Sequence, residues 1–177
     1  MPHETPPNFP PMKSYRELQV ALNRAVEGVQ SERPRSERIY NDLIRYLTAQ
    51  VGIPKGCAFF VTINEGQAAL ISPNASGIVF TNEDRSWSVN LVLRIHQTGP
   101  RANHIHLLIV PRLTFQQDEV AIGISDSSVE SVTLNHTEGE GTNKIVEKLS
   151  DLVTEAAALR MDSFAGGDDR KIGFAQE

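Results

Sequence analysis

Two stretches decide the fold: Ser88-Val-Asn-Leu-Val-Leu-Arg-Ile-His96 and, after a turn, His104-Ile-His-Leu-Leu-Ile-Val-Pro-Arg112. The odd-numbered positions of both stretches are apolar, a period of two that is typical of strands with one buried face. An antiparallel register in which paired residue numbers sum to 200 places Leu93 opposite Leu107 on that face. On the other face, the same register pairs Arg94 with His106 and His96 with His104. The sequence therefore predicts a β-hairpin with one apolar face and one cationic, titratable face.

The face of this hairpin that points away from the core carries the candidate site. Guanidinium groups bind carboxylate or phosphate bidentately, and imidazoles gain positive charge as the pH falls, so the pattern favours a small anionic ligand. The alternative is structural, because histidines are also tolerated as polar neighbours on half-exposed sheet faces. Apart from Trp87 the two strands lack stacking aromatics, which does not favour nucleic acid as a partner. The candidate ligand-binding residues are Arg94, His96, Arg101, His104, His106 and Arg112.

The pair His104 and His106 also has the spacing of two metal ligands, because alternate residues of a strand lie about 6–7 Å apart on one face. His96 on the neighbouring strand would complete a three-histidine zinc site. Arg94 and Arg112 on the same face would repel a dication, and neither strand carries a carboxylate to balance its charge. The prediction is therefore no metal and no cofactor.

The segment from Gln97 to Arg112 resembles the motif of the histidine-triad nucleotide hydrolases and transferases, in which histidine and apolar residues alternate three times on a strand. The resemblance covers about 16 of the 177 residues. It implies that His104 and His106 fill the first two motif positions and that His106 attacks a phosphate; Leu108 stands at the third position. The alternative function is thus a small hydrolase or phosphotransferase, histidine-triad-like or metal-dependent, that uses His104 and His106.

Helical periodicity precedes the hairpin. Ser14 and Glu17 have the spacing of a capping box, and apolar residues at helical spacing follow them. This pattern predicts a helix over 14–30. A charged, proline-containing hinge at 31–38 and a second apolar stripe predict another helix over 36–51.

After these helices the apolar period changes to two, with turn residues between short runs. The predicted strands are 57–63, 67–72, 77–81, 87–96, 104–115, 119–125 and 129–136. Their short connections predict antiparallel neighbours. An apolar seam then predicts a last helix over 142–160. The expected class is α+β: two N-terminal helices, a long antiparallel β-meander of about seven strands in a curved sheet or partial barrel, and one C-terminal helix.

The chain ends differ in composition from this domain. Residues 1–13 contain five prolines and are predicted to be disordered, and 163–177 lack an apolar period and are predicted to form a flexible tail. Residues 14–162 are predicted to form a single α+β domain, because a chain near this size buries about two thirds of its unfolded surface in one core.

Charge, cysteine content and hydropathy narrow the class of function. Residues 1–117 carry a net charge of +3 and residues 118–177 carry −8, an asymmetry that indicates self-association or a protein partner. Cys57, the one cysteine, lies in an apolar run and is interpreted as a small buried hydrophobe. No membrane span or secretory signal is recognisable, so a cytoplasmic location is expected. Without a complete catalytic set, the sequence favours a non-enzymatic binding or accessory domain that self-associates, and no catalytic residue is assigned.

Overall fold

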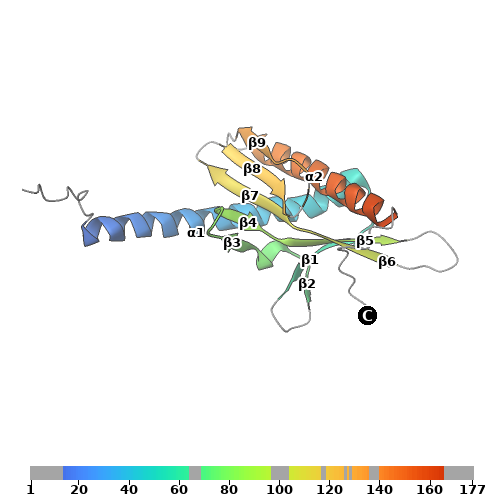
Figure 1. Cartoon of the computed structure of the whole chain (residues 1–177), viewed down its shortest axis with the longest axis horizontal. Helices are drawn as coiled ribbons and strands as arrows, with labels where there is room; N and C mark the ends of the chain where they lie inside the picture. Colours follow the sequence, from blue (N-terminus) through green and yellow to red (C-terminus); the bar gives the residue numbers. More distant parts are fainter. Residues whose placement is uncertain are drawn as a thin grey trace, which may run out of the picture.

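The computed structural model describes residues 14–63, 69–96, 104–116, 119–125, 127, 129–135 and 140–165. Within them a long helix, α1, is followed by nine strands and a C-terminal helix, α2 (Figure 1). This order confirms the α+β class. The N-terminal segment 1–13, the turn containing Arg101 and the segment 166–177 lie outside the described residues.

The N-terminal region is one helix, not two. α1 spans Tyr15–Tyr46, and the predicted capping box is confirmed: the Ser14 hydroxyl accepts a hydrogen bond from the Glu17 amide, and the Glu17 carboxylate accepts one from the Ser14 amide. A π-helical turn, Leu47–Val51, continues it and ends at Gly52, which adopts a φ of +81°. This left-handed conformation favours glycine.

The predicted hinge at 31–38 is wrong because side-chain contacts support the helix on both sides of Pro34. Arg33 forms an ion pair of 3.1 Å with Glu37 across the proline, and the Ser36 hydroxyl donates to the Glu32 carbonyl at 3.0 Å. The Glu32 carboxylate also accepts a hydrogen bond of 3.0 Å from the indole of Trp87. Proline fixes a helical φ and loses one backbone donor, and these contacts compensate for that loss.

The strands form two sheets instead of one meander. The first, called the hairpin sheet, contains in spatial order β2 (Leu70–Ser72), β1 (Ala58–Thr62), β5 (Asn90–His96) and β6 (His104–Ile109). The second sheet contains β3 (Val79–Thr81), β4 (Ser86–Ser88), β7 (Pro111–Gln116), β8 (Glu119–Ile124) and β9 (Val132–Asn135). All of the pairings are antiparallel, but β1 with β5 and β4 with β7 are not sequence neighbours. The topology is therefore more than a meander, and a barrel is not confirmed.

Two predicted strands each cross from one sheet to the other. The stretch 87–96 divides at Val89 into β4 and β5, and the stretch 104–115 divides at Val110 into β6 and β7. Pro111 cannot donate a ladder hydrogen bond, which fits its position as the first residue of β7. Within the hairpin, the predicted register is confirmed at every pair from Leu91 opposite Ile109 to His96 opposite His104.

A single apolar core joins the two sheets to the helices. Leu91, Leu107 and Ile109 from the hairpin sheet are buried together with Leu43 of α1 and Leu149 of α2. α2 spans Glu140–Ala165, longer at both ends than predicted, and packs against α1, β6 and β8 (Figure 1).

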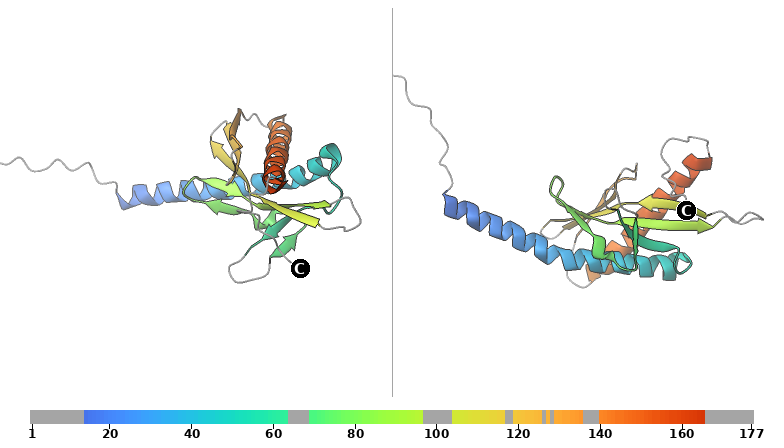
Figure 2. Two further views of the ribbon diagram at one scale, coloured as in Figure 1. Left: turned by 45° about the vertical axis from the view of Figure 1, so that its right-hand side comes forward. Right: turned by 90° about the horizontal axis from the view of Figure 1, so that it is seen from below.

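The N-terminal half of α1 is not part of this core. Residues 14–27 are all exposed, whereas Ile39, Tyr40 and Leu43 in the second half are fully buried. Figure 2 shows this half projecting from the remainder of the structure as a free-standing helix.

Candidate functional site

The structure brings four of the six predicted site residues together on the outer face of the hairpin sheet. His96 ends β5 and His104 begins β6, both exposed, with their Nδ1 atoms 3.1 Å apart and their rings nearly perpendicular. Since one nitrogen of such a pair must donate and the other accept, at least one of these Nδ1 atoms carries a proton.

The second pair, Arg94 and His106, is half-buried, and its two side chains are hydrogen-bonded to each other. Nε of Arg94 donates a hydrogen bond of 3.0 Å to Nε2 of His106. The Phe59 ring packs edge-on against the imidazole at 6.3 Å between centroids, and the guanidinium carbon lies 5.5 Å from the same ring. Because Nε2 accepts from the guanidinium, the neutral imidazole carries its proton on Nδ1.

Arg112 does not join this cluster, and Arg101 lies outside the described residues. Arg112 belongs to β7 in the second sheet, where its guanidinium forms an ion pair of 2.9 Å with Asp84. A hydrogen bond from the Ser86 hydroxyl, with a smaller contribution from Arg112, lowers the pKa of Asp84 below its usual value. The single cationic surface predicted from the sequence is therefore divided between two sheets.

One residue of the site was missed by sequence analysis. Cys57 extends β1 by one position, where its carbonyl accepts a hydrogen bond of 2.7 Å from the Arg94 amide. Its Sγ lies 3.3 Å from Nε2 of His96. The β1–β5 register would have indicated this contact, because it places Cys57 opposite Arg94 and diagonal to His96. That register was not predicted, because β1 and β5 are separated by three other strands.

Cys57, His96 and His104 form a continuous chain of contacts but not a metal site. His96 presents Nε2 to the thiol and the opposite nitrogen, Nδ1, to His104. One imidazole cannot direct both nitrogens at one ion, so the three side chains form a chain of contacts and do not converge on one centre. Across the described residues, no group of three His, Cys, Asp or Glu side chains is placed to hold a metal.

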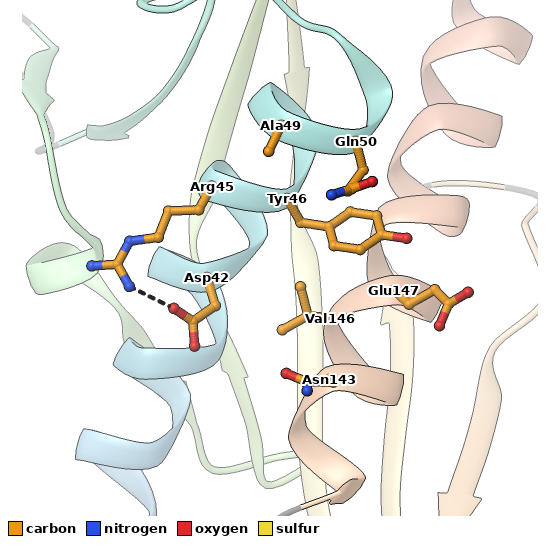
Figure 3. A pocket seen from close by; sticks show the side chains of 8 residues that line it. All are labelled: Asp42, Arg45, Tyr46, Ala49, Gln50, Asn143, Val146 and Glu147. Carbon is orange, nitrogen blue, oxygen red and sulfur yellow. Dashed lines mark hydrogen bonds and ion pairs between the residues drawn. The ribbon is translucent and has the colours of Figure 1, made fainter.

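The second feature of the surface is a groove between the end of α1 and the start of α2 (Figure 3). This open groove has a volume of about 430 Å³. Its lining is mixed: Tyr46 and Val146 are apolar, and Asp42 forms an ion pair of 2.9 Å with Arg45. Glu147 also lines the groove, which therefore carries two carboxylates and one guanidinium.

The exposed half of α1 is the third feature. Tyr15, Leu18, Leu22 and Val26 follow helical spacing, and between 45% and 75% of each is exposed. The same heptad spacing continues through Val29 into the buried face of the second half. The face that builds the core thus extends beyond the core with no covering element among the described residues.

Comparison with protein-family models, with curated proteins and with solved structures finds no match for this chain. No helix among the described residues has the length and apolar character needed to cross a membrane.

Proposed function

We propose that the chain is a non-enzymatic binding module that self-associates through the exposed half of α1, residues 15–29. The observation that carries the proposal is the apolar stripe of Tyr15, Leu18, Leu22 and Val26, which is continuous with the buried face of the same helix. A helical segment of this length is marginal in water without tertiary contacts, and amphipathic helices gain most of their stability by packing. A partner that covers the stripe would provide that packing.

A second copy is the partner that the charges favour. The exposed half carries Arg16, Arg24, Glu17 and Glu27, so it has no net charge. The positions on either side of the stripe are uncharged: Gln19, Ala21 and Gly28. Two identical helices therefore meet without like-charge repulsion, and a strongly acidic or basic partner gains nothing from this surface.

The shape of the molecule is also compatible with self-pairing. Leu18, Leu22 and Val26 are spaced by four and form the kind of ridge that packs into a groove of a facing helix. In an antiparallel pair, the two folded bodies would lie at opposite ends of the paired helices, since each helix projects from its body at one end (Figure 2). No other surface of the two copies would then have to match.

The test is the molar mass of the full chain measured by sedimentation equilibrium from low to high micromolar concentration. Wild type is expected to move from monomer to dimer with concentration. Leu22→Asp, which places an unpaired carboxylate on the stripe, is expected to weaken association by roughly tenfold or more. Val20→Asp is the matched control, because Val20 is 44% exposed on the opposite side of the same helical segment. It introduces the same residue in the same helical segment, and should dimerise like wild type.

Two outcomes would overturn this proposal. Wild type could remain monomeric over the whole range, which would exclude a second copy as the partner. Alternatively, Leu22→Asp and Val20→Asp could weaken association equally, which would place the interface elsewhere.

The histidine-based functions have less support. Anion binding is favoured by several cationic groups on one surface, whereas Arg112 lies in the second sheet and is paired with Asp84. Arg94 remains on the hairpin face, with its Nε donating to His106. A hydrolase or phosphotransferase that uses His106 needs a free ring nitrogen, and Nε2 of His106 accepts from Arg94. Turnover of a nucleotide that is lost in His106→Ala would nevertheless favour that alternative. The cytoplasmic location expected from the sequence is part of the proposal.

A further inference from the structure

The contacts of Cys57 with His96, and of His96 with His104, connect a buried sulfur to the molecular surface. Only 6% of Cys57 is exposed, whereas both histidines are exposed. The contacts are 3.3 Å from Sγ to Nε2 of His96 and 3.1 Å from Nδ1 of His96 to Nδ1 of His104. We propose that Cys57 is a reactive thiol, activated by His96 and oriented through His104, which is oxidised by hydrogen peroxide.

The geometry meets the requirements for an activated nucleophile. A nucleophile needs a base within hydrogen-bond reach, and the base needs a third group that fixes its orientation. His96 is the base, and His104, which contacts its far nitrogen, is the positioning residue. The backbone also holds the sulfur in place, since the hydrogen bond from the Arg94 amide to the Cys57 carbonyl extends the β1–β5 ladder to this residue.

The charged surroundings favour the same reaction. Among the described residues, the titratable and charged groups on this face are His96, His104, Arg94 and, beyond Arg94, His106. None of them is acidic. Arg94 lies directly opposite Cys57 in the ladder, with its guanidinium bonded to His106. No described carboxylate on this face therefore opposes the negative charge that develops on sulfur during attack.

Burial determines the class of reagent. A sulfur this enclosed admits a compact molecule and excludes a peptide or a protein disulfide, because these need an open approach along the bond that breaks. Hydrogen peroxide fits this restriction. No second cysteine in the chain can resolve the product, so the oxidised form is not converted into a disulfide within the chain.

Oxidation of Cys57 by hydrogen peroxide begins with a proton transfer. The thiol proton moves from Sγ to Nε2 of His96, and the sulfur attacks one oxygen of the peroxide. The S–O bond forms as the O–O bond breaks, so sulfur is oxidised by two electrons and the peroxide is reduced. The departing hydroxide takes the proton from His96 and leaves as water. Cys57 becomes a sulfenic acid, and His96 returns to its neutral form.

The test measures the rate at which the full-length protein, treated with hydrogen peroxide, gains the mass of one oxygen at Cys57, detected by intact mass. Cys57→Ser gives the background. His96→Phe keeps a ring at an exposed position but removes the base, and should react at least roughly tenfold more slowly near neutral pH.

His106→Phe is the matched control, since it removes a ring on the same face that does not contact the thiol, and its reaction should be no slower than that of wild type. Thermal melts of each variant identify any that fail to fold, and His104→Phe, which retains the base, then provides a second variant expected to react more slowly than wild type. The proposal is overturned if folded His96→Phe reacts like wild type, or if wild type reacts no faster than the chain unfolded in denaturant. Neither result depends on the oligomeric state.

Discussion

The hydroxyl of Tyr40 lies beside both positions at which the chain passes between the sheets. It is within hydrogen-bond distance of the carbonyl oxygens of Trp87, at 2.6 Å, and Pro111, at 3.1 Å. The side chain is fully buried. Burial raises the pKa of Tyr40 well above its usual value of 10.0, against a smaller opposing effect of the positive charge on Arg112. The buried hydroxyl therefore ties α1 to β4 and β7 only in its protonated form.

Tyr40→Phe should lower the free energy of unfolding by about 1–3 kcal/mol at pH 8, because it leaves buried carbonyl groups without this donor. Above pH 10 the unfolded chain loses the Tyr40 proton while the folded chain keeps it. Wild type then loses stability relative to the variant by about 1.4 kcal/mol per pH unit. Urea unfolding of both proteins between pH 8 and pH 11 should show the difference narrowing. A constant difference would show that Tyr40 does not cause this pH dependence.

Individual residues also show the limit of sequence analysis. Tyr40 lies on the apolar stripe from which the helix over 36–51 was predicted, but the two partners of its hydroxyl lie 47 and 71 residues away in the chain. Likewise Cys57 was predicted to be buried, and it is, while its contact with His96 spans 39 residues. Periodicity predicts which face a side chain occupies, but a polar partner from a distant element depends on the packing of the whole chain.

At the scale of elements, local pairing was predictable and the division into sheets was not. The hairpin register follows from apolar alternation in adjacent strands, because a slip of one residue would turn the apolar set towards solvent. The breaks at Val89 and Val110 interrupt no apolar pattern, since both of these residues are themselves apolar. At Val89 nothing local distinguishes a strand that continues from one that changes sheets, whereas at Val110 the following Pro111, which cannot donate a ladder hydrogen bond, is a local signal of the break.

Pro34 gives a prediction for α1. It removes the donor that would bond to the Gln30 carbonyl, yet the helix continues through it. Pro34→Ala should raise the free energy of unfolding by about 1–2 kcal/mol, less than the roughly 3 kcal/mol difference in helix propensity, because proline also restricts the unfolded chain. Thermal melts measure this change, with Asn23→Ala as an exposed control expected to gain less than about 1 kcal/mol. A lower melting temperature for Pro34→Ala would contradict this expectation. It would show that the local geometry at the proline is needed for the second half of α1 to pack in the core.

At the scale of the whole molecule, the structure separates a folded body from a projecting helix. Described residues up to position 27 are exposed, and the buried residues of α1 begin at Ser36. Folding of the body and pairing of the helix should therefore be separable. A chain that lacks residues 1–28 keeps every buried residue of the described core.

The truncated chain should melt within about 2 °C of wild type at low micromolar concentration, where both are monomers, since surface changes of this kind contribute about 0.5 kcal/mol or less. At high concentration, wild type should gain stability by mass action, because only the folded form dimerises, and the truncated chain should not. Scanning calorimetry at two concentrations measures both effects. If the truncated chain melts far below wild type at low concentration, the exposed half of α1 stabilises its own body, and its apolar stripe would then be part of one molecule's core instead of a surface for a second copy.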